Sequence, residues 1–222
     1  TIVASAMMGA MLNEKARQLG LAEDEPRGRS LAADDFDVAE ALGSAHIYAQ
    51  EGRFDDALGV VNRGLNAAPM HQELNWRRLR LLRLLEKDKP WQAHLARFLR
   101  QQLANGNEGS AVQIWLEAQQ QQPGFRFEEE GSLSLSLAQA LYERGRLKEA
   151  QHLLVNLHQR TPGFPLLGTA YVLLARLYME QHGDLLRAGK LLAFVEKHFP
   201  DQFQSQESCE AMQVFQRLKA AG

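Results

Sequence analysis

The chain contains a single cysteine, no long apolar run and no excess of charge of either sign. The lone thiol, Cys209, excludes an internal disulfide framework and any zinc site built from several cysteines. Lys and Arg number 25 against 27 Asp and Glu, so no global field draws the molecule to nucleic acid or to an anionic membrane. Apolar residues still make up 45% of 222 residues, which is ample for a buried core. Any charged partner must therefore be recognised locally.

The motifs of common catalytic and cofactor sites are also missing. There is no Walker A loop, no dinucleotide-binding GxGxxG, no HExxH and no GxSxG. His152 and His158 are six residues apart, so they would lie on opposite sides of one helix. We interpret Cys209 as a small packing residue and residues 128–130 as carboxylates that complement the dipole of a following helix. The sequence predicts no enzyme, no metal and no cofactor.

The first 35 residues differ from the rest of the chain. Residues 1–13 carry no charged side chain and are too few for a membrane span, which needs about 20 apolar residues. They also lack the basic start of a secretory signal. Two interpretations stay open: a helix that packs on the protein or on a second copy, and the end of a membrane anchor that begins before Thr1. Residues 22–35 are acidic and contain Pro26 and Gly28, so we expect a linker, with the folded domain over 36–222.

What the sequence does have is a repeated spacing of glycine, alanine and proline. A left-handed residue that ends a first helix favours Gly, a close helix crossing favours Ala, and Pro ends a second helix because it lacks an N–H. Each copy therefore predicts two antiparallel helices. The four copies are Gly52, Ala57 and Pro69; Gly106, Ala111 and Pro123; Gly145, Ala150 and Pro162; Gly183, Ala188 and Pro200.

This pattern resembles the tetratricopeptide repeat (TPR), a helix-turn-helix unit of 34 residues. The resemblance covers units 38–69, 92–123, 131–162 and 168–200, and the second unit is degenerate, with Leu99 and Gln102 at the small and aromatic positions. The first unit meets the family pattern at Ala45, Tyr48, Gly52, Phe54, Ala57 and Pro69. The resemblance implies an all-α solenoid, a right-handed superhelix of helix pairs. The long interval between Pro69 and Pro123 accommodates an inserted helix over 73–87, and apolar spacing predicts a capping helix over 206–220.

In the family, the first helix of each unit lines a concave groove. Arginine, tyrosine and glutamine there offer charge-assisted bonds to the carboxylates or main-chain carbonyls of an extended peptide. The family's carboxylate clamp is absent, because Leu42 and His46 stand where Lys and Asn would, so chaperone tails are not expected. The residues that the resemblance places in the groove are His46, Arg97, Arg100, Gln139, Tyr142 and Arg176, with Met179 and Glu143 alongside.

Residues 71–100 concentrate basic charge, with eight basic and three acidic side chains. Leucines line the opposite face of the inserted helix. Three interpretations stay open: a solvated face or a neutral contact with the acidic N-terminal third, a docking site for an acidic protein segment, and a site for nucleic acid or anionic lipid, which lacks interleaved aromatics. The basic stripe consists of Arg77, Arg80, Arg83 and Lys87.

We expect a non-catalytic scaffold that binds a protein or peptide partner in the concave groove. The first unit is similar to repeat segments of bacterial pilus-assembly and polar-organising proteins, which implies a soluble module of a larger bacterial assembly. Self-association into a homo-oligomer through the apolar N-terminal helix is the alternative, followed by an enzyme with an unrecognised site and by nucleic-acid binding. We expect a cytoplasmic protein that binds no nucleic acid, with membrane association only through a segment upstream of Thr1.

Overall fold

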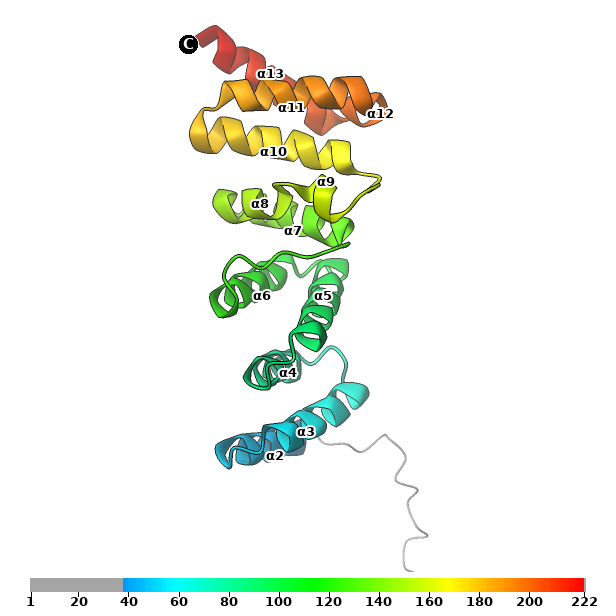
Figure 1. The fold of residues 1–222 in the computed structure, drawn as a ribbon, viewed down its shortest axis with the longest axis vertical. Coiled ribbons are helices and arrows are strands. Elements are labelled where there is room, and N and C mark those ends of the chain that lie inside the picture. Colours follow the sequence, from blue (N-terminus) through cyan, green and yellow to red (C-terminus); the bar gives the residue numbers. More distant parts are fainter. Residues whose placement is uncertain (1–37, 222) are drawn as a thin grey trace, which may run out of the picture. The chain divides into compact units, whose positions relative to one another are not determined.

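The structure is a computed structural model that describes residues 38–221 (Figure 1). Every regular element in this range is a helix, so the described chain has the all-α, TPR-like helix-turn-helix fold that the spacing predicts. The N-terminal helix and linker expected over 1–35 lie outside the described residues. Chain contacts separate the described residues into two compact units, which divide between Leu74 and Asn75, and the sequence does not indicate this division.

The first unit contains a hairpin of α2 (Val38–Gln50) and α3 (Phe54–Ala67), followed by the start of α4 (Gln72–Leu84). Small residues determine how closely its helices approach. A Cβ added to Gly64 of α3 would lie 2.9 Å from Leu74 Cδ1 and 3.3 Å from Ala41 Cβ. Larger residues at these contacts would force the helices apart.

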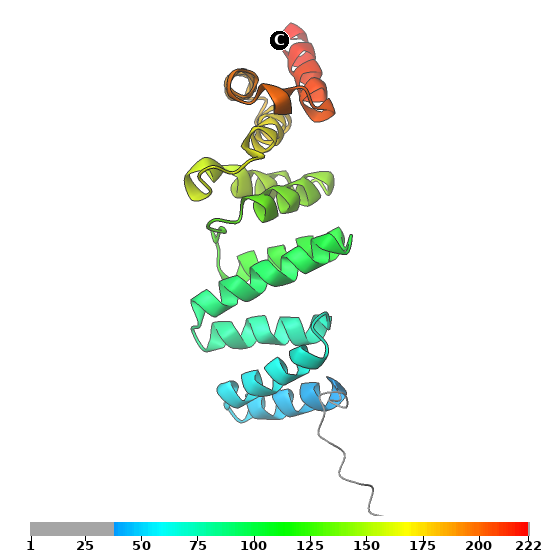
Figure 2. The same ribbon diagram turned by 90° about the vertical axis from the view of Figure 1, so that its right-hand side faces the viewer.

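The second unit begins within α4 and continues as a succession of hairpins (Figures 1 and 2). The pairs α5/α6, α7/α8 and α10/α11 follow one another, and α13 packs on α10 and α11. The helix expected over 73–87 ends at Leu84. The elements of the unit after α4 are α5 (Asp88–Ala104), α6 (Glu108–Gln121), α7 (Gly131–Glu143), α8 (Leu147–Leu154), α9 (Leu157–Arg160), α10 (Leu167–His182), α11 (Leu185–His198), α12 (Pro200–Phe203) and α13 (Gln206–Ala221).

The repeated glycines and alanines have the roles that their spacing predicts. The glycine between the two helices of each hairpin has a positive φ, 75° at Gly52 and 59° at Gly183, a conformation that costs a residue with a Cβ more than it costs glycine. The alanine five residues later is fully buried in every copy, at Ala57, Ala111, Ala150 and Ala188. Each hairpin therefore closes on an alanine that neighbouring side chains surround completely.

Aromatic residues that follow a hairpin fold back onto the first turn of its first helix. Phe125 follows α6, and its ring centroid lies 5.2 Å from that of Trp91 in α5. Phe164 covers Gly131 so closely that a Cβ there would lie 2.7 Å from the ring. Phe199 covers Gly168 similarly, because a Cβ there would lie 2.8 Å from the Phe199 Cβ and 3.0 Å from its ring atom Cγ. Each contact joins the end of a repeat to its beginning and buries apolar surface.

The second helix of the third repeat, residues 131–162, is interrupted, contrary to the sequence prediction. His152 lies in α8 and His158 in α9, and the two helices are separated by Val155 and by Asn156, which has a left-handed conformation at φ 58°. The side chain of Arg160 stabilises the break. Its guanidinium donates to the carbonyl oxygens of Leu153 at 2.5 Å, Val155 at 3.3 Å and Phe127 at 2.9 Å. The bonds to Leu153 and Val155 satisfy carbonyls that a continuous helix would have paired internally. The two histidines therefore do not share one helix.

The packing interpretation of Cys209 is wrong, because this residue is exposed. Its neighbour Ser208 is the buried residue, and the Ser208 hydroxyl donates to the carbonyl oxygen of Gln202 at 3.1 Å. Helix α13 thus turns a small polar residue inward at this position and leaves the thiol in solvent.

Replacing Ala188 by leucine tests the buried alanine. Ala188→Leu adds three carbon atoms to a site with no exposed surface, and overpacking of this kind lowers the free energy of unfolding by about 1–3 kcal/mol. Ala193→Leu, at an exposed position of the same helix, is the matched control and changes stability by less than about 0.5 kcal/mol. Urea unfolding followed by circular dichroism measures both. Equal stability of the two variants would contradict close packing at Ala188.

Candidate binding groove

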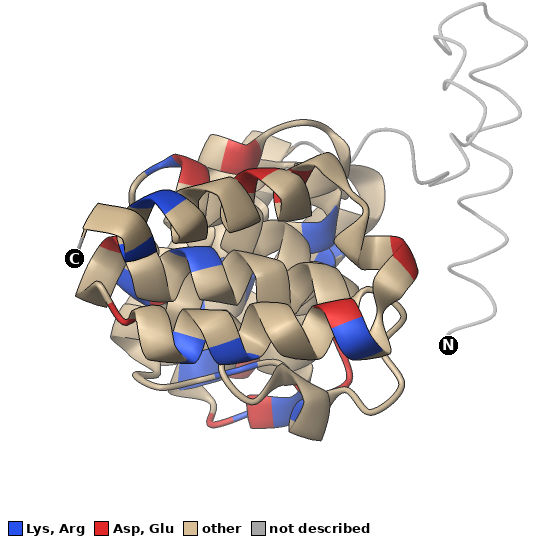
Figure 3. Ribbon diagram, turned by 90° about the horizontal axis from the view of Figure 1, so that it is seen from above, with Lys and Arg blue, Asp and Glu red and all other residues tan. Residues whose placement is uncertain are grey.

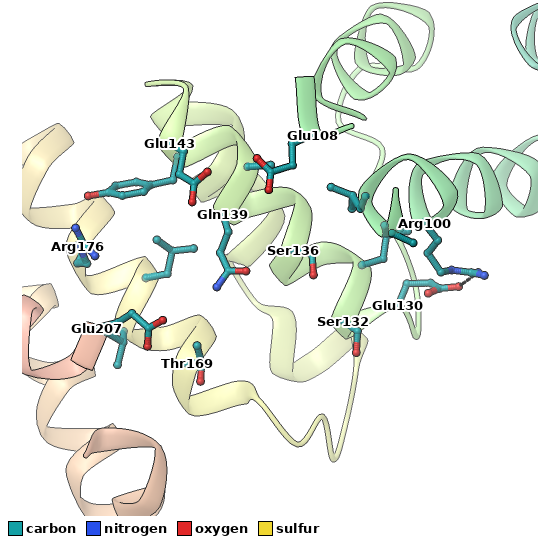
Figure 4. A pocket seen from close by; sticks show the side chains of 17 residues that line it. Arg100, Glu108, Glu130, Ser132, Ser136, Gln139, Glu143, Thr169, Arg176 and Glu207 are labelled. Atoms are coloured by element: carbon teal, nitrogen blue, oxygen red, sulfur yellow. Dashed lines mark hydrogen bonds and ion pairs between the residues drawn. The ribbon is translucent and has the colours of Figure 1, made fainter. Parts of the chain in front are cut away.

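A hollow of about 810 Å³ lies in the second unit, along the first helices of its hairpins (Figure 4). Helices α5, α7 and α10 supply most of its lining, and α6 and α13 add one glutamate each. On α10 the lining residues Thr169, Val172, Leu173 and Arg176 are spaced by three, one and three positions, so they share one face. We call this hollow the polar groove.

Four of the six predicted groove residues line this hollow together. Arg100 comes from α5, Gln139 and Tyr142 from α7, and Arg176 from α10. They lie close together because the hairpins place equivalent faces of successive first helices next to each other. His46 belongs to the first unit, where it is exposed on α2. Arg97 is exposed on α5 but does not line the hollow.

Both arginines of the polar groove have partners within the protein. Arg100 Nη2 donates to Glu130 Oε1 at 2.6 Å. The Arg176 guanidinium carbon lies 5.0 Å from the ring centroid of Tyr142, in a cation–π contact. The Tyr142 hydroxyl in turn donates to Glu180 at 2.5 Å, and burial together with this hydrogen bond raises the pKa of Tyr142. These contacts restrain both arginines, and Glu130 partly neutralises Arg100.

Carboxylates outnumber cations in the lining of the polar groove. Two of the four glutamates are paired, Glu130 with Arg100 and Glu108 with Arg144 at 3.2 Å. Glu143 and Glu207 form no ion pair with any described residue. The sequence analysis expected a groove that presents cations, whereas the assembled lining has an excess of negative charge.

The sequence analysis identified only part of this lining. Glu143 was placed beside the groove, but Glu130 was assigned to the helix dipole, and nothing connected Glu207 of the expected cap to the groove. Ser132 and Thr169 were also missed. Both were within reach of prediction, because Ser132 and Thr169 lie seven residues, about two helical turns, before the predicted groove residues Gln139 and Arg176. Glu207 had no such signal, because its place depends on how α13 packs against α10.

Arg97 contributes to a different cluster, around the buried His94. His94 Nδ1 lies 3.3 Å from Nη2 of Arg97 and 3.4 Å from Nη1 of Arg78. Two guanidinium donors make Nδ1 an acceptor, which leaves Nε2 to donate to the Asn75 carbonyl oxygen at 3.4 Å. Burial, and then the two arginines, lower the pKa of His94 to about 3. The imidazole is therefore neutral at physiological pH.

Only three of the four residues of the predicted basic stripe, Arg77, Arg80 and Arg83, lie on α4. Because α4 ends at Leu84, Lys87 lies beyond the helix, at the N-cap of α5. Arg83 donates to Asp88 at 2.5 Å and lies over the ring of Trp91 at 5.5 Å, while Arg80 is exposed. Basic and acidic residues are interspersed along the described helices (Figure 3).

Neither a metal site nor a membrane-spanning helix is present within residues 38–221. No group of three or more His, Cys, Asp or Glu side chains in this range could hold a metal ion. None of the helices in the same range combines the length and apolar character that crossing a membrane requires.

Comparison with known proteins gives matches among solved structures alone. No protein-family model and no curated protein matches the chain. YrrB, described as a TPR protein with an unusual peptide-binding site, is 12% identical over 82% of this chain and 100% of its own, with a TM-score of 0.38. TTC0263, a TPR protein of Thermus thermophilus, is 16% identical over 81% and 100%, with a TM-score of 0.34. TPR-like repeats of a putative kinesin light chain from Podosopora anserina are 20% identical over 83% and 92%, with a TM-score of 0.41. The similarity to pilus-assembly and polar-organising proteins stays a prediction.

The His94 cluster predicts a pH dependence of stability. An unfolded histidine takes up a proton near pH 6.5, whereas folded His94 resists protonation down to about pH 3. The unfolded state therefore binds more protons between these values, and His94 lowers the free energy of unfolding by about 1.4 kcal/mol for each pH unit below 6.5. The stability difference between the native protein and His94→Gln is thus expected to shrink from pH 7 to pH 4. Urea unfolding at several pH values measures it, and a constant difference would contradict a neutral His94.

Proposed function

We propose that the protein is a non-catalytic interaction scaffold whose polar groove holds an extended segment of a partner protein. The observation that carries this proposal is that α5, α7 and α10 together line one continuous hollow. An extended segment presents unpaired N–H and C=O groups along its length, and Ser132, Ser136 and Gln139 line the hollow with side chains that can bond both. Val172 and Leu173 supply apolar surface for its side chains.

The charges of the lining favour a partner segment that carries lysine or arginine. Arg100 and Arg176 are already engaged, by Glu130 and by the ring of Tyr142. Glu143 and Glu207 come from different helices, and each has acceptor oxygens available to a cation. A basic side chain in the polar groove would bring the uncompensated charge of the lining closer to balance. This assignment reverses the sign of the partner charge expected from the sequence.

The alternative functions rest on parts of the chain that the structure does not describe or on features that it does not assemble. Self-association through residues 1–13 stays a prediction, because these residues lie outside the described range. The same holds for a role as a module of a larger bacterial assembly. Nucleic-acid binding has less support, because the four residues of the basic stripe do not share one helix.

Selection of peptides tests the groove and its charge preference. A random dodecapeptide library displayed on phage is selected against the protein, and the enriched peptides are expected to contain lysine or arginine. Binding is then compared for Glu143→Gln/Glu207→Gln, which removes both available carboxylates. A charge-assisted hydrogen bond contributes about 1.5–3 kcal/mol, so affinity is expected to fall at least about tenfold. Fluorescence anisotropy with labelled peptides measures the dissociation constants.

The matched control is Glu196→Gln/Asp201→Asn, which removes two exposed carboxylates outside the polar groove. This variant is expected to bind the selected peptides as tightly as the native protein does. Peptides without basic residues would contradict the charge preference. Peptides that bind the native protein and the Glu143→Gln/Glu207→Gln variant equally would contradict the groove itself.

A further inference from the structure

A second hollow, of about 600 Å³, lies on the opposite face of α10 from the polar groove. Its walls come from the interruption between α8 and α9 and from α11, and its floor comes from α10. On α10 it is lined by Tyr171, Leu174 and Tyr178, which repeat at spacings of three and four and so share a face. We call it the apolar groove, bounded by Asn156, Tyr171 and Phe194.

The apolar groove exists because α8, the second helix of the third repeat, ends early. Helix α8 packs against α10 and ends at Leu154, after which left-handed Asn156 redirects the chain into α9. Val155 and His158 consequently become wall residues of the groove. The bonds from Arg160 to the carbonyl oxygens of Leu153 and Val155 hold this break in place. The groove is therefore formed by ordered, hydrogen-bonded backbone.

Aromatic surface is exposed along this groove. Phe194 of α11 is 42% exposed, and its ring centroid lies 5.8 Å from that of Tyr171. The Tyr171 hydroxyl is fixed by the Nδ1 atom of His158 at 2.8 Å, so the floor is joined to the wall at the break. Contiguous apolar surface of this kind is typical of a binding site in a soluble protein.

The charges at the edge of the apolar groove have one sign. Arg187 and Lys190 of α11 line it, and no Asp or Glu among the described residues does so. Arg187 forms an ion pair with Asp184, in which Nε lies 3.3 Å from Oδ2, and its guanidinium lies over the ring of Tyr178. Lys190 is exposed and forms no ion pair within residues 38–221. An apolar floor with cations at one edge is complementary to a segment that is apolar on one side and acidic beside it.

We propose that the apolar groove binds an amphipathic helix of a partner protein, with leucine, isoleucine or phenylalanine on the floor and aspartate or glutamate against Lys190 and Arg187. A helix is the favoured shape because Tyr171, Leu174 and Tyr178 form a ridge along one face of α10, and ridges of this spacing pack against the grooves of a neighbouring helix. The site shares no lining residue with the polar groove, so it does not depend on the function proposed for that groove.

The experiment selects helical peptides against the native protein and tests them on four surface variants. The library displays helices with randomised residues on one face and its flanks. Phe194→Ser removes the exposed aromatic ring, with Leu186→Ser, 70% exposed on the same helix, as its control. Lys190→Glu reverses the charge at the edge, with Lys197→Glu, also exposed on α11, as its control. All four positions are exposed, and circular dichroism melting curves check that every variant folds.

The expected peptides are enriched in Asp and Glu next to an apolar stripe. Their affinity falls at least about tenfold in Phe194→Ser and Lys190→Glu and stays unchanged in the two controls. A peptide whose acidic residues are changed to lysine regains affinity for Lys190→Glu. Affinity is also unchanged in Glu143→Gln/Glu207→Gln, which separates this site from the polar groove.

Three results would overturn the proposal. The first is a set of selected peptides without acidic enrichment, and the second is a set whose affinity Phe194→Ser does not change. The third concerns a lipid, tested with the fluorescent fatty acid cis-parinaric acid. If this probe binds the native protein but not Phe194→Ser, and no helical peptide is selected, the groove is a fatty-acid site instead.

Discussion

The close packing of two helices against a buried alanine is the contact on which the rest of the structure depends. In every hairpin this alanine has no exposed surface, and a left-handed glycine five residues earlier turns the chain so that the contact can form. Since both helices of a hairpin are neighbours in sequence, the contact is local, as in other repeat proteins. Its consequence reaches further, because hairpins of similar geometry place their first helices side by side and thereby form the polar groove.

Features that depend on local contacts could be predicted from the sequence, whereas features that depend on contacts between distant segments could not. The spacing of Gly, Ala and Pro predicted the hairpins, and the resemblance to the TPR family implied that Arg100, Gln139, Tyr142 and Arg176 line one groove. The interruption after Leu154 was not predictable in this way, because Leu154 and Leu157 keep helical spacing across it. Arg160, whose bonds to Leu153 and Val155 hold the break, also donates to the Phe127 carbonyl oxygen, a contact between segments 33 residues apart that helical spacing does not reveal.

Electrostatics was the other part that the sequence could not supply. Counting groove positions identified arginines, but the effective charge of an arginine depends on what lies beside it. Glu130 pairs with Arg100 across 30 residues of chain, and Glu207 reaches the groove because α13 packs on α10. The polar groove thus has a surplus of carboxylates, while the apolar groove has cations and an apolar floor. Two sites of opposite character lie in one helical unit.

Helix α10 is a wall of both grooves. Thr169, Val172 and Arg176 face one hollow, while Tyr171, Leu174 and Tyr178 face the other. A rotation or shift of this helix that widened one hollow would alter the shape of the other. If the two occupants favour different settings of α10, each changes the affinity of the other by the same factor, because linkage between two binding equilibria is reciprocal. A movement of this one shared helix would therefore be enough to couple the affinity of one groove for its ligand to the affinity of the other.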